Sequence, residues 1–199
     1  MIVYEEQLSR DGGWALLEGS MHFERESAVH KTMQSLAKTL ERLQISYAVV
    51  GGMALFLHGY RRFTEDVDLL VTADGLRAIH EQLAGRGYVP VYEGSRNLRD
   101  TDNGVRIEFL VTGQFPGDGK PKPVAFPLPD ETSQVIEGIR CLDVVNLVQL
   151  KLASGTGKGR RKDLGDVQEM IRHLSLPRDL VDQLDESVRA MYLELWDEL

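Results

Sequence analysis

Two aspartates alternate with apolar residues in the segment DVDLLV, residues 66–71. Side chains of a β-strand point to opposite faces in turn, so Asp66 and Asp68 share one face while Val67 and Leu69 face the other layer. Two like charges this close repel each other, and burial strengthens the repulsion. A shared proton, a basic partner or a divalent metal ion would relieve it. The alternative is that both side chains lie in water at the edge of a sheet.

A carboxylate pair on one strand face suits two-metal chemistry, in which ions about 3.5–4 Å apart hold a phosphoryl group during in-line displacement. Oxygen ligands favour Mg²⁺ or Mn²⁺ over zinc. Glu108 is the candidate third carboxylate, because it is a charge inside the apolar strand pattern VRIEFLV, residues 105–111. It reaches the same face if this strand lies beside residues 66–71, and otherwise it is an exposed edge glutamate. Asp100 and Asp102 rank lower because DTDNG is typical of a turn.

Gly51 and Gly52 stand between a strand pattern and a short apolar helix, about fifteen residues before Asp66. Without side chains, their backbone can approach a phosphate closely, and the start of a helix presents unpaired amides and the positive end of its dipole. A simple tight turn is the alternative explanation for two adjacent glycines. Combined with the two aspartates, the pair predicts triphosphate amides and metal carboxylates in one cleft.

Polar residues between the glycines and the aspartates are further candidates. Arg61 and Arg62 either contact phosphates or solvate a loop. Thr64 precedes Asp66 by two positions, so it shares the same face if the strand already runs there. His58 ends the short helix and is better explained as a packing or capping residue than as a catalytic one.

The sequence has a formal net charge of −8 among 199 residues, which argues against binding nucleic acid through bulk charge. A local basic segment, KLASGTGKGRRK at residues 151–162, is the exception. It resembles a Walker phosphate loop, but Lys158 is followed by Gly159 instead of Ser or Thr, and a helix pattern precedes it, so the match fails. The segment either contacts phosphate or is an ordinary solvated loop. It contains no aromatic residue that would support RNA binding.

Hydrophobic periodicity predicts a mixed α/β part at roughly residues 28–125, followed by a mostly helical part at 126–199. The first 27 residues form an N-terminal extension with weak periodicity. Residues 113–132 hold five of the seven prolines and are expected to form a loop or a connection between the two parts. The predicted strands are residues 45–50, 66–71, 88–92, 105–111 and 135–142. The predicted helices are residues 30–43, 53–59, 74–87 with Asp74 as its cap, 143–154, 162–174, and a C-terminal helix with Leu180, Leu184, Val188, Met191 and Leu195 on one face.

Composition is that of an ordinary soluble protein, with 42% hydrophobic and 27% charged residues. The single cysteine, Cys141, excludes an internal disulfide and agrees with a reducing compartment. The N-terminus is acidic where a signal peptide needs a basic start, and we find no apolar run long enough to span a bilayer. We therefore expect a cytoplasmic protein with no membrane partner.

The segment GGMALFLHGYRRFTEDVDLLV, residues 51–71, resembles the signature of the nucleotidyltransferase superfamily that includes DNA polymerase β and kanamycin nucleotidyltransferase. It is similar in particular to stand-alone bacterial and archaeal forms related to the AbiEii abortive-infection toxins. Those proteins carry two small residues, a short helix, an Arg-x-Thr-x-Asp-x-Asp stretch and a later third acidic residue. Residues 62–68 fit that stretch in full. The segment LVQLKLAS…RRKDLGDVQEM also resembles their helical part, with Lys151 and Asp163 at the positions of a functional lysine and aspartate.

The resemblance implies a nucleotidyltransferase fold, with a mixed β-sheet flanked by helices, and residues 28–125 as its catalytic core. It implies transfer of a nucleotidyl group from an NTP, with Mg²⁺ or Mn²⁺, to a hydroxyl or phosphate acceptor. Asp66, Asp68 and Glu108 would hold the metal ions. Glu108 departs from the family, which more often has aspartate there; its longer side chain either serves as a general base or indicates reduced activity.

Nucleotide binding would fall to Gly51 and Gly52, together with Arg62, Thr64 and Asp163. Lys151 would neutralise charge that develops on the phosphates, unless its side chain simply extends from a buried helix to water.

Three functions follow as hypotheses. The first is a nucleotidyltransferase acting on an unidentified acceptor, which could be RNA or tRNA, a protein or a small molecule. The second is a non-catalytic protein of the same fold that binds a nucleotide or a protein partner. The third is the toxin component of a toxin–antitoxin pair, with an antitoxin-like partner.

Overall fold

The computed structural model describes residues 3–155, 157 and 159–199. Its described residues build a mixed sheet in the order β3-β4-β5-β2-β1-β7-β6. The strands are β1 (Tyr47–Val50), β2 (Asp66–Val71), β3 (Tyr88–Pro90), β4 (Leu98–Asp100), β5 (Arg106–Val111), β6 (Ser133–Ile136) and β7 (Ile139–Leu142). Two central pairings position the site: β2 runs antiparallel to β1 and parallel to β5.

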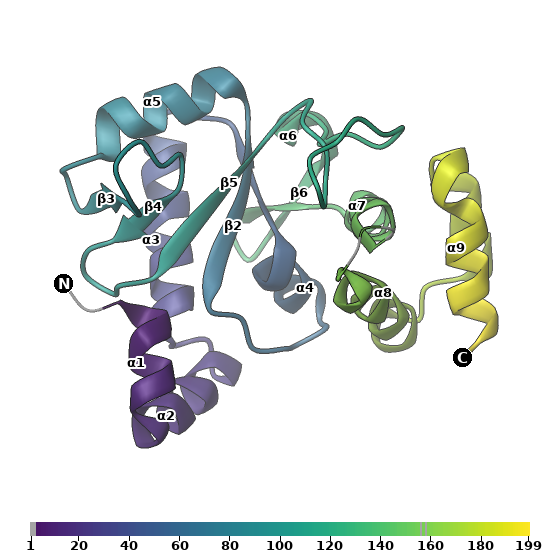
Figure 1. Ribbon diagram of the computed structural model, residues 1–199, viewed down its shortest axis with the longest axis horizontal. Coiled ribbons are helices and arrows are strands. Elements are labelled where there is room, and N and C mark those ends of the chain that lie inside the picture. Colours follow the sequence, from purple (N-terminus) through teal and green to yellow (C-terminus); the bar gives the residue numbers. More distant parts are fainter. Residues whose placement is uncertain (1–2, 156, 158) are drawn as a thin grey trace.

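Helices flank this sheet, as Figure 1 shows: α3, α4 and α5 lie around it, and two further groups lie at opposite ends of the molecule. The purple helices α1 and α2 lie at one end, and α7, α8 and α9 lie at the other. The helices are α1 (Tyr4–Arg10), α2 (Gly12–Phe23), α3 (Ala28–Arg42), α4 (Gly51–His58), α5 (Ala73–Leu83), α6 (Pro129–Thr132), α7 (Val144–Gly155), α8 (Arg161–Leu174) and α9 (Glu186–Asp197), with a short 3-10 helix η1 (Arg178–Gln183) before α9. The fold class predicted from the sequence is confirmed.

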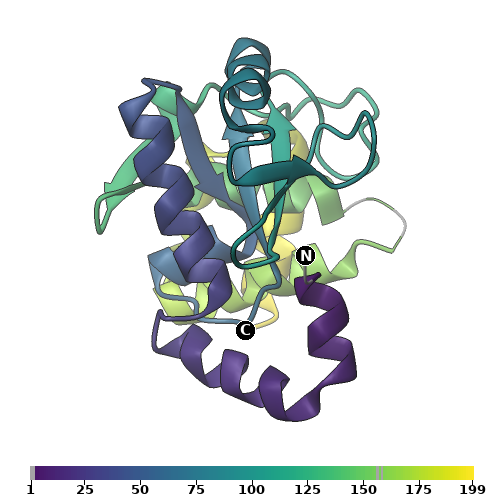
Figure 2. The same ribbon diagram turned by 90° about the vertical axis from the view of Figure 1, so that its left-hand side faces the viewer.

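The long helix α3 lies across one face of the sheet (Figure 2). Its buried side chains Met33, Leu36 and Leu40 recur at helical spacing, and Ser27 caps its first turn by accepting from the His30 amide. Burying this apolar stripe, together with Val67 and Leu69 of β2, provides much of the core. Because these β2 side chains face the core, the alternate positions Asp66 and Asp68 are left partly exposed on the other face.

Several predicted elements are confirmed with small shifts, among them the strands at 45–50 and 66–71 and the helices at 143–154 and 162–174. The helix predicted over residues 74–87 is confirmed as α5, although it ends at Leu83. The prediction that Asp74 is its N-terminal cap is wrong. Thr72 accepts from the Gly75 amide through Oγ1, whereas Asp74 lies in the first turn of α5 and pairs with Arg77. The short strand β4 was not predicted.

The prediction of one strand over residues 135–142 is wrong, because this segment forms most of a β-hairpin. Glu137 and Gly138 both have left-handed backbone angles, with φ of 53° and 80°, and form the tight turn between β6 and β7. The strand β7 then pairs in parallel with β1. The sheet therefore extends across the boundary predicted near residue 125, and the division into two parts stays a prediction.

The single C-terminal helix predicted from the leucine spacing is also wrong. Leu184 is extended, and the Asp185 side chain accepts from the Ser187 amide at 2.9 Å to cap α9. This separates η1, which carries Leu180, from α9. The predicted apolar side chains all pack on the core, Met191 being only partly buried there.

The N-terminal extension folds into α1 and α2, which pack against the body of the protein. Tyr4 is buried against Trp14, and its hydroxyl donates to Oε2 of Glu18 at 3.0 Å. Glu18 also accepts from the Ala28 amide, and the Tyr4 amide donates to the carbonyl of Gly104. Within the residues described, no helix is both long and apolar enough to cross a membrane.

Candidate active site

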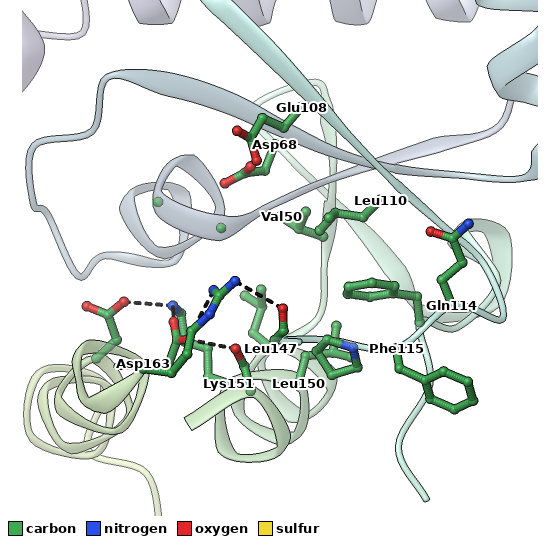
Figure 3. A pocket seen from close by; sticks show the side chains of 18 of the residues that line it. Val50, Asp68, Glu108, Leu110, Gln114, Phe115, Leu147, Leu150, Lys151 and Asp163 are labelled. Atoms are coloured by element: carbon green, nitrogen blue, oxygen red, sulfur yellow. Dashed lines mark hydrogen bonds and ion pairs between the residues drawn. The ribbon is translucent and has the colours of Figure 1, made fainter. Parts of the chain in front are cut away.

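The carboxylates of Asp66, Asp68 and Glu108 converge on one face of the sheet. Each offers an oxygen, and the three oxygens lie within 4.8 Å of one another. The register of β2 and β5 explains this, because Asp68 stands directly opposite Glu108 in the parallel pair. The neighbouring strands expected from the sequence are therefore confirmed, and Figure 3 shows the Asp68 and Glu108 carboxylates side by side.

The electrostatics of this cluster are unfavourable without a cation. Asp68 keeps part of its surface in water, but protein surrounds most of its carboxyl. This desolvation, followed by the charges of Asp66 and Glu108, raises the pKa of Asp68 to about 8, although Lys151 and Arg106 oppose the shift. Arg106 is the nearest counter-ion: its Nη2 lies 2.9 Å from Oε1 of Glu108 and 3.2 Å from Oδ2 of Asp66. Two of the three factors expected to reduce the repulsion between the carboxylates are thus present. They are a basic partner, Arg106, and a raised proton affinity of Asp68.

Arg106 was missed in the sequence. It precedes Glu108 by two positions on the same strand, so the alternation that places Glu108 on the site face also places Arg106 there. The signal is local, because Arg106 lies within the strand pattern of residues 105–111.

The two glycines are explained by close approach to the carboxylate strand. Gly51 has φ of +62°, and a β-carbon there would lie 1.9 Å from Oδ2 of Asp68. A β-carbon on Gly52 would lie 2.7 Å from Cβ and Oγ1 of Thr64. Thr64 in turn donates from Oγ1 to Oδ1 of Asp66 at 3.0 Å. The first residues of α4 therefore lie directly against the carboxylates, and no side chain caps this helix start.

A second charged cluster is centred on Lys151 of α7. Its Nζ lies 2.6 Å from Oδ2 of Asp166 and 3.3 Å from Oδ1 of Asp163, both on α8. Ser154 donates to Oδ2 of Asp163 at 2.7 Å. Lys151 is buried, so its side chain does not extend to water as the alternative supposed. Figure 3 shows Lys151 and Asp163 across the cleft from Asp68 and Glu108.

Arg62 joins this second cluster through Asp166, which sequence reasoning also missed. Nε of Arg62 lies 3.2 Å from Oδ1 of Asp166, and Nη2 lies 3.2 Å from Oδ2. The Nη2 contact is a hydrogen bond, and the Nε contact is an ion pair without hydrogen-bond geometry. Asp166 follows Asp163 by three positions, which places both on one face of α8. In this structure Arg62 is therefore neither a free phosphate ligand nor a solvated loop residue.

The two clusters bound an open cleft of about 960 Å³ between the sheet, α4, α7, α8 and the proline-rich loop. Charged residues line one part of it. Apolar side chains line another part, where Val50 and Leu110 lie across from Leu147 and Leu150, and Phe115 also lines the cleft (Figure 3). A single ligand in this cleft could therefore contact the carboxylates, the amides at the start of α4, the paired cations and the apolar side chains.

The remaining candidates lie elsewhere or serve other contacts. His58 donates from Nε2 to the Leu142 carbonyl at 2.8 Å, which is a packing role. Asp100 accepts from Thr32 and Asn103 at the turn before β5, in agreement with its lower rank. Arg61 lies over the ring of Phe56.

The basic segment 151–162 is described in part. Arg160 lies beside the cleft, where it pairs with Asp163 and donates to the Gly117 carbonyl. Lys162 lines the cleft as well. Lys158, the lysine of the rejected phosphate-loop match, lies outside the described residues.

The sheet and the helices around it have a nucleotidyltransferase-like fold, as solved structures of similar fold show. A nucleotidyltransferase-like antigenic protein from Paracoccidioides brasiliensis is similar in structure, with a TM-score of 0.53, 19% identity, and coverage of 84% of this chain and 87% of that one. The structure of ANT(2″)-Ia in complex with adenylyl-2″-tobramycin is similar at a TM-score of 0.51 and 14% identity, covering 83% of this chain and 97% of that one. At these identities the likeness concerns the fold.

No family model matches the chain, and no curated protein matches it.

Proposed function

We propose that this protein is a metal-dependent nucleotidyltransferase that moves a nucleoside monophosphate from an NTP to an acceptor. The observation that carries the proposal is the convergence of three carboxylates with the start of α4 at one cleft. Shared fold alone would not support an activity, since one fold hosts many functions.

A divalent ion fits the carboxylate cluster on chemical grounds. Asp66, Asp68 and Glu108 offer oxygen donors, which suit Mg²⁺ or Mn²⁺, and their mutual repulsion is only partly relieved by Arg106. When bound, such ions would supply positive charge to the phosphate oxygens and lower the pKa of an acceptor hydroxyl.

The chain's own residues would bind and orient the nucleotide. The amides that open α4 at Gly51 and Gly52 would donate to triphosphate oxygens. Lys151 and Arg62 would bring positive charge to the same phosphates, sharing it with Asp163 and Asp166. Thr64 holds Asp66 in place through its hydroxyl.

The transfer itself balances as an in-line displacement. An acceptor oxygen would form a bond to the α-phosphorus while the bond from that phosphorus to the bridging oxygen breaks and pyrophosphate leaves. Glu108, which lines the cleft, would receive the acceptor's proton.

Three acceptor classes remain: RNA or tRNA, a protein, and a small molecule. The structurally similar ANT(2″)-Ia was solved with adenylyl-2″-tobramycin, and the apolar wall of this cleft offers a surface for a ring. The cleft volume also lies within the range of small-molecule sites. These observations support a small-molecule hydroxyl as the first acceptor class to test. A relation to AbiEii toxins, with an antitoxin-like partner, remains part of the proposal.

A single labelling experiment tests the activity and the acceptor together. The protein is incubated with each of the four NTPs, labelled at the α-phosphate, with Mg²⁺ and separated fractions of RNA, soluble protein and small metabolites from a cell extract. Label that moves into one fraction and is lost with Asp66→Ala would establish transfer and name the acceptor class. If no label moves and no NTP binds, the enzymatic proposal is wrong.

A non-catalytic binding protein is the second candidate. The observation in its favour is that Arg62 and Lys151 are already paired with carboxylates, and Arg106 already occupies the acidic cluster. Binding of NTP that is unaffected by Mg²⁺, with no transfer to any fraction, would favour this function.

A further inference from the structure

Arg106 lies between two acidic groups that belong to different parts of the chain. On one side, its Nη2 contacts Glu108 and Asp66 of the candidate metal site at 2.9 and 3.2 Å. On the other side, its Nε lies 3.8 Å from Oε1 of Glu5, on the N-terminal helix α1. Nε is buried and has no hydrogen-bond partner among the residues described. One guanidinium thus connects the site to the N-terminal extension, with its hydrogen-bonding capacity only partly used.

Glu5 is held in place independently of Arg106. Its carboxylate pairs at two points with Arg99, whose Nη1 lies 2.7 Å from Oε2 and whose Nη2 lies 3.2 Å from Oε1. Arg99 is buried and also donates to the Gly104 carbonyl, to which the Tyr4 amide donates as well. The acidic group of α1 is therefore a fixed acceptor that faces Arg106.

We propose that Arg106 is a resident counter-ion of the carboxylate cluster, which a divalent metal ion displaces toward Glu5, so that metal binding and the docking of α1 are coupled. This inference rests on the metal site of the proposed function. A metal ion would compete with the guanidinium for the carboxylates of Asp66 and Glu108, which Arg106 contacts through Oδ2 and Oε1. Positive charges at such a distance repel, and Glu5 is the nearest other anion to Arg106.

Reciprocity follows from thermodynamic linkage. If metal binding strengthens the pair between Arg106 and Glu5, then an intact Glu5 must raise the affinity of the site for metal by the same factor. Arg106 has the opposite effect, because it occupies the metal's ligands. Glu5 and Arg106 variants should therefore change the metal affinity in opposite directions, which a merely structural role for this ion pair would not produce.

The test measures Mn²⁺ binding alone, by electron paramagnetic resonance of free Mn²⁺ at fixed pH and salt, so that nucleotide transfer is not needed. We expect Glu5→Gln to weaken Mn²⁺ binding about five-fold or more, and Arg106→Gln to strengthen it by a similar factor. The matched control is Glu6→Gln, which removes the same charge from the same helix at an exposed residue that pairs with Arg10 and not with Arg106. This control should change Mn²⁺ affinity little.

A double variant separates the coupling from long-range attraction. In the Arg106→Gln background, Glu5→Gln should weaken Mn²⁺ binding no more than Glu6→Gln does, because the displaced cation is gone. As a second readout, Mn²⁺ should slow amide hydrogen exchange in α1 of the parent protein and leave it unchanged in Arg106→Gln. Hydrogen exchange measured on Glu5→Gln reports whether that variant still folds.

The outcomes are distinct. If the parent protein binds Mn²⁺ and Glu5→Gln binds it as tightly as Glu6→Gln does, the coupling is wrong and the proposed function stands. If both Glu5→Gln and Arg106→Gln weaken binding, the ion pair is structural and the coupling is again wrong. If the parent protein binds no Mn²⁺ at all, the metal site of the proposed function fails, and this inference fails with it.

Discussion

A β-carbon on Gly51 would lie 1.9 Å from Oδ2 of Asp68, so the start of α4 and the central carboxylate of the site occupy adjoining space. This contact ties the two parts of the motif together physically. The backbone that would receive phosphates cannot move away from the carboxylates that would receive metal without opening a gap beside β2. A side chain larger than that of glycine at position 51 would therefore clash with Asp68.

Gly51→Ala should lower both stability and NTP binding. The substitution adds a clash with Asp68 and forces alanine to a φ of +62°, so we expect the free energy of unfolding to fall by about 1–3 kcal/mol. Urea unfolding measures this. The control is Gly165→Ala, inside α8, where an added β-carbon meets nothing within 4 Å. That variant should gain about 0.5–1 kcal/mol from helix propensity. Equal stability of the two variants would contradict the steric explanation.

Metal binding should release a proton from Asp68. The pKa of this carboxyl is raised from 3.8 to about 8, so below pH 8 the metal-free protein holds a proton there that a divalent ion must expel. Calorimetry of Mn²⁺ binding at pH 6.5, in buffers with different ionisation enthalpies, should show release of roughly one proton. Binding without proton release would contradict a protonated Asp68.

The same raised pKa predicts how stability changes with pH. Between pH 3.8 and about 8 the folded state binds a proton at Asp68 that the unfolded chain does not, so this group's contribution to stability decreases as pH rises through that window. Asp68→Asn removes this dependence. The difference in unfolding free energy between Asp68→Asn and the parent protein should therefore grow in favour of the variant from pH 5 to pH 8. A constant difference would show that Asp68 titrates normally.

Asp166 should matter more to stability than Asp163. Asp166 is buried and is the shared partner of Arg62 and Lys151, whereas Asp163 is more exposed and its partner Lys151 keeps a second contact. Removing one member of a buried ion network leaves an uncompensated charge, which costs about 3–5 kcal/mol in measured cases. Asp166→Asn should approach that loss in urea unfolding, and Asp163→Asn should lose clearly less. The reverse order would contradict the network as described.

His30 should make the protein sensitive to acid. The His22 Nε2 donates to the Arg62 carbonyl, so its Nδ1 accepts from Ser27, whose oxygen in turn accepts from Nδ1 of His30. This leaves Nε2 of His30 buried without a hydrogen-bond partner among the residues described. A proton added there has no acceptor, in agreement with burial lowering the pKa of His30 to about 4.

Because the unfolded chain protonates this histidine near its ordinary pKa of 6.5, stability should be lost as pH falls from 6.5 toward 4. His30→Gln should flatten that loss in thermal unfolding measured at several pH values. Asp68 changes stability in the opposite direction over this pH range, so the measurement is made in the Asp68→Asn variant as well. If that variant is equally stable at pH 4.5 and pH 6.5, the lowered pKa of His30 is wrong.

Local patterns predicted the parts of the site that depend on neighbours in the chain. The alternation in DVDLLV placed Asp66 and Asp68 on one face because the side-chain period of a strand is independent of the rest of the fold. Gly59 ends α4 with φ of 111°, as a glycine after an apolar helix suggests. The hairpin at 133–142 is also locally encoded, but Glu137 before Gly138 is a weaker turn signal than asparagine or aspartate.

Only the tertiary structure decided which groups meet. That Glu108 faces Asp68 depends on β5 pairing with β2, and that Asp166 holds Arg62 depends on a contact between residues 104 positions apart. The position of Glu5 beside Arg106 likewise depends on α1 packing against the turn at Gly104. Such pairings are set by the burial of whole helices and strands together, which no short segment contains. The sequence by itself determined the chemical types and faces of the candidate groups, and the packing of distant elements decided their partners.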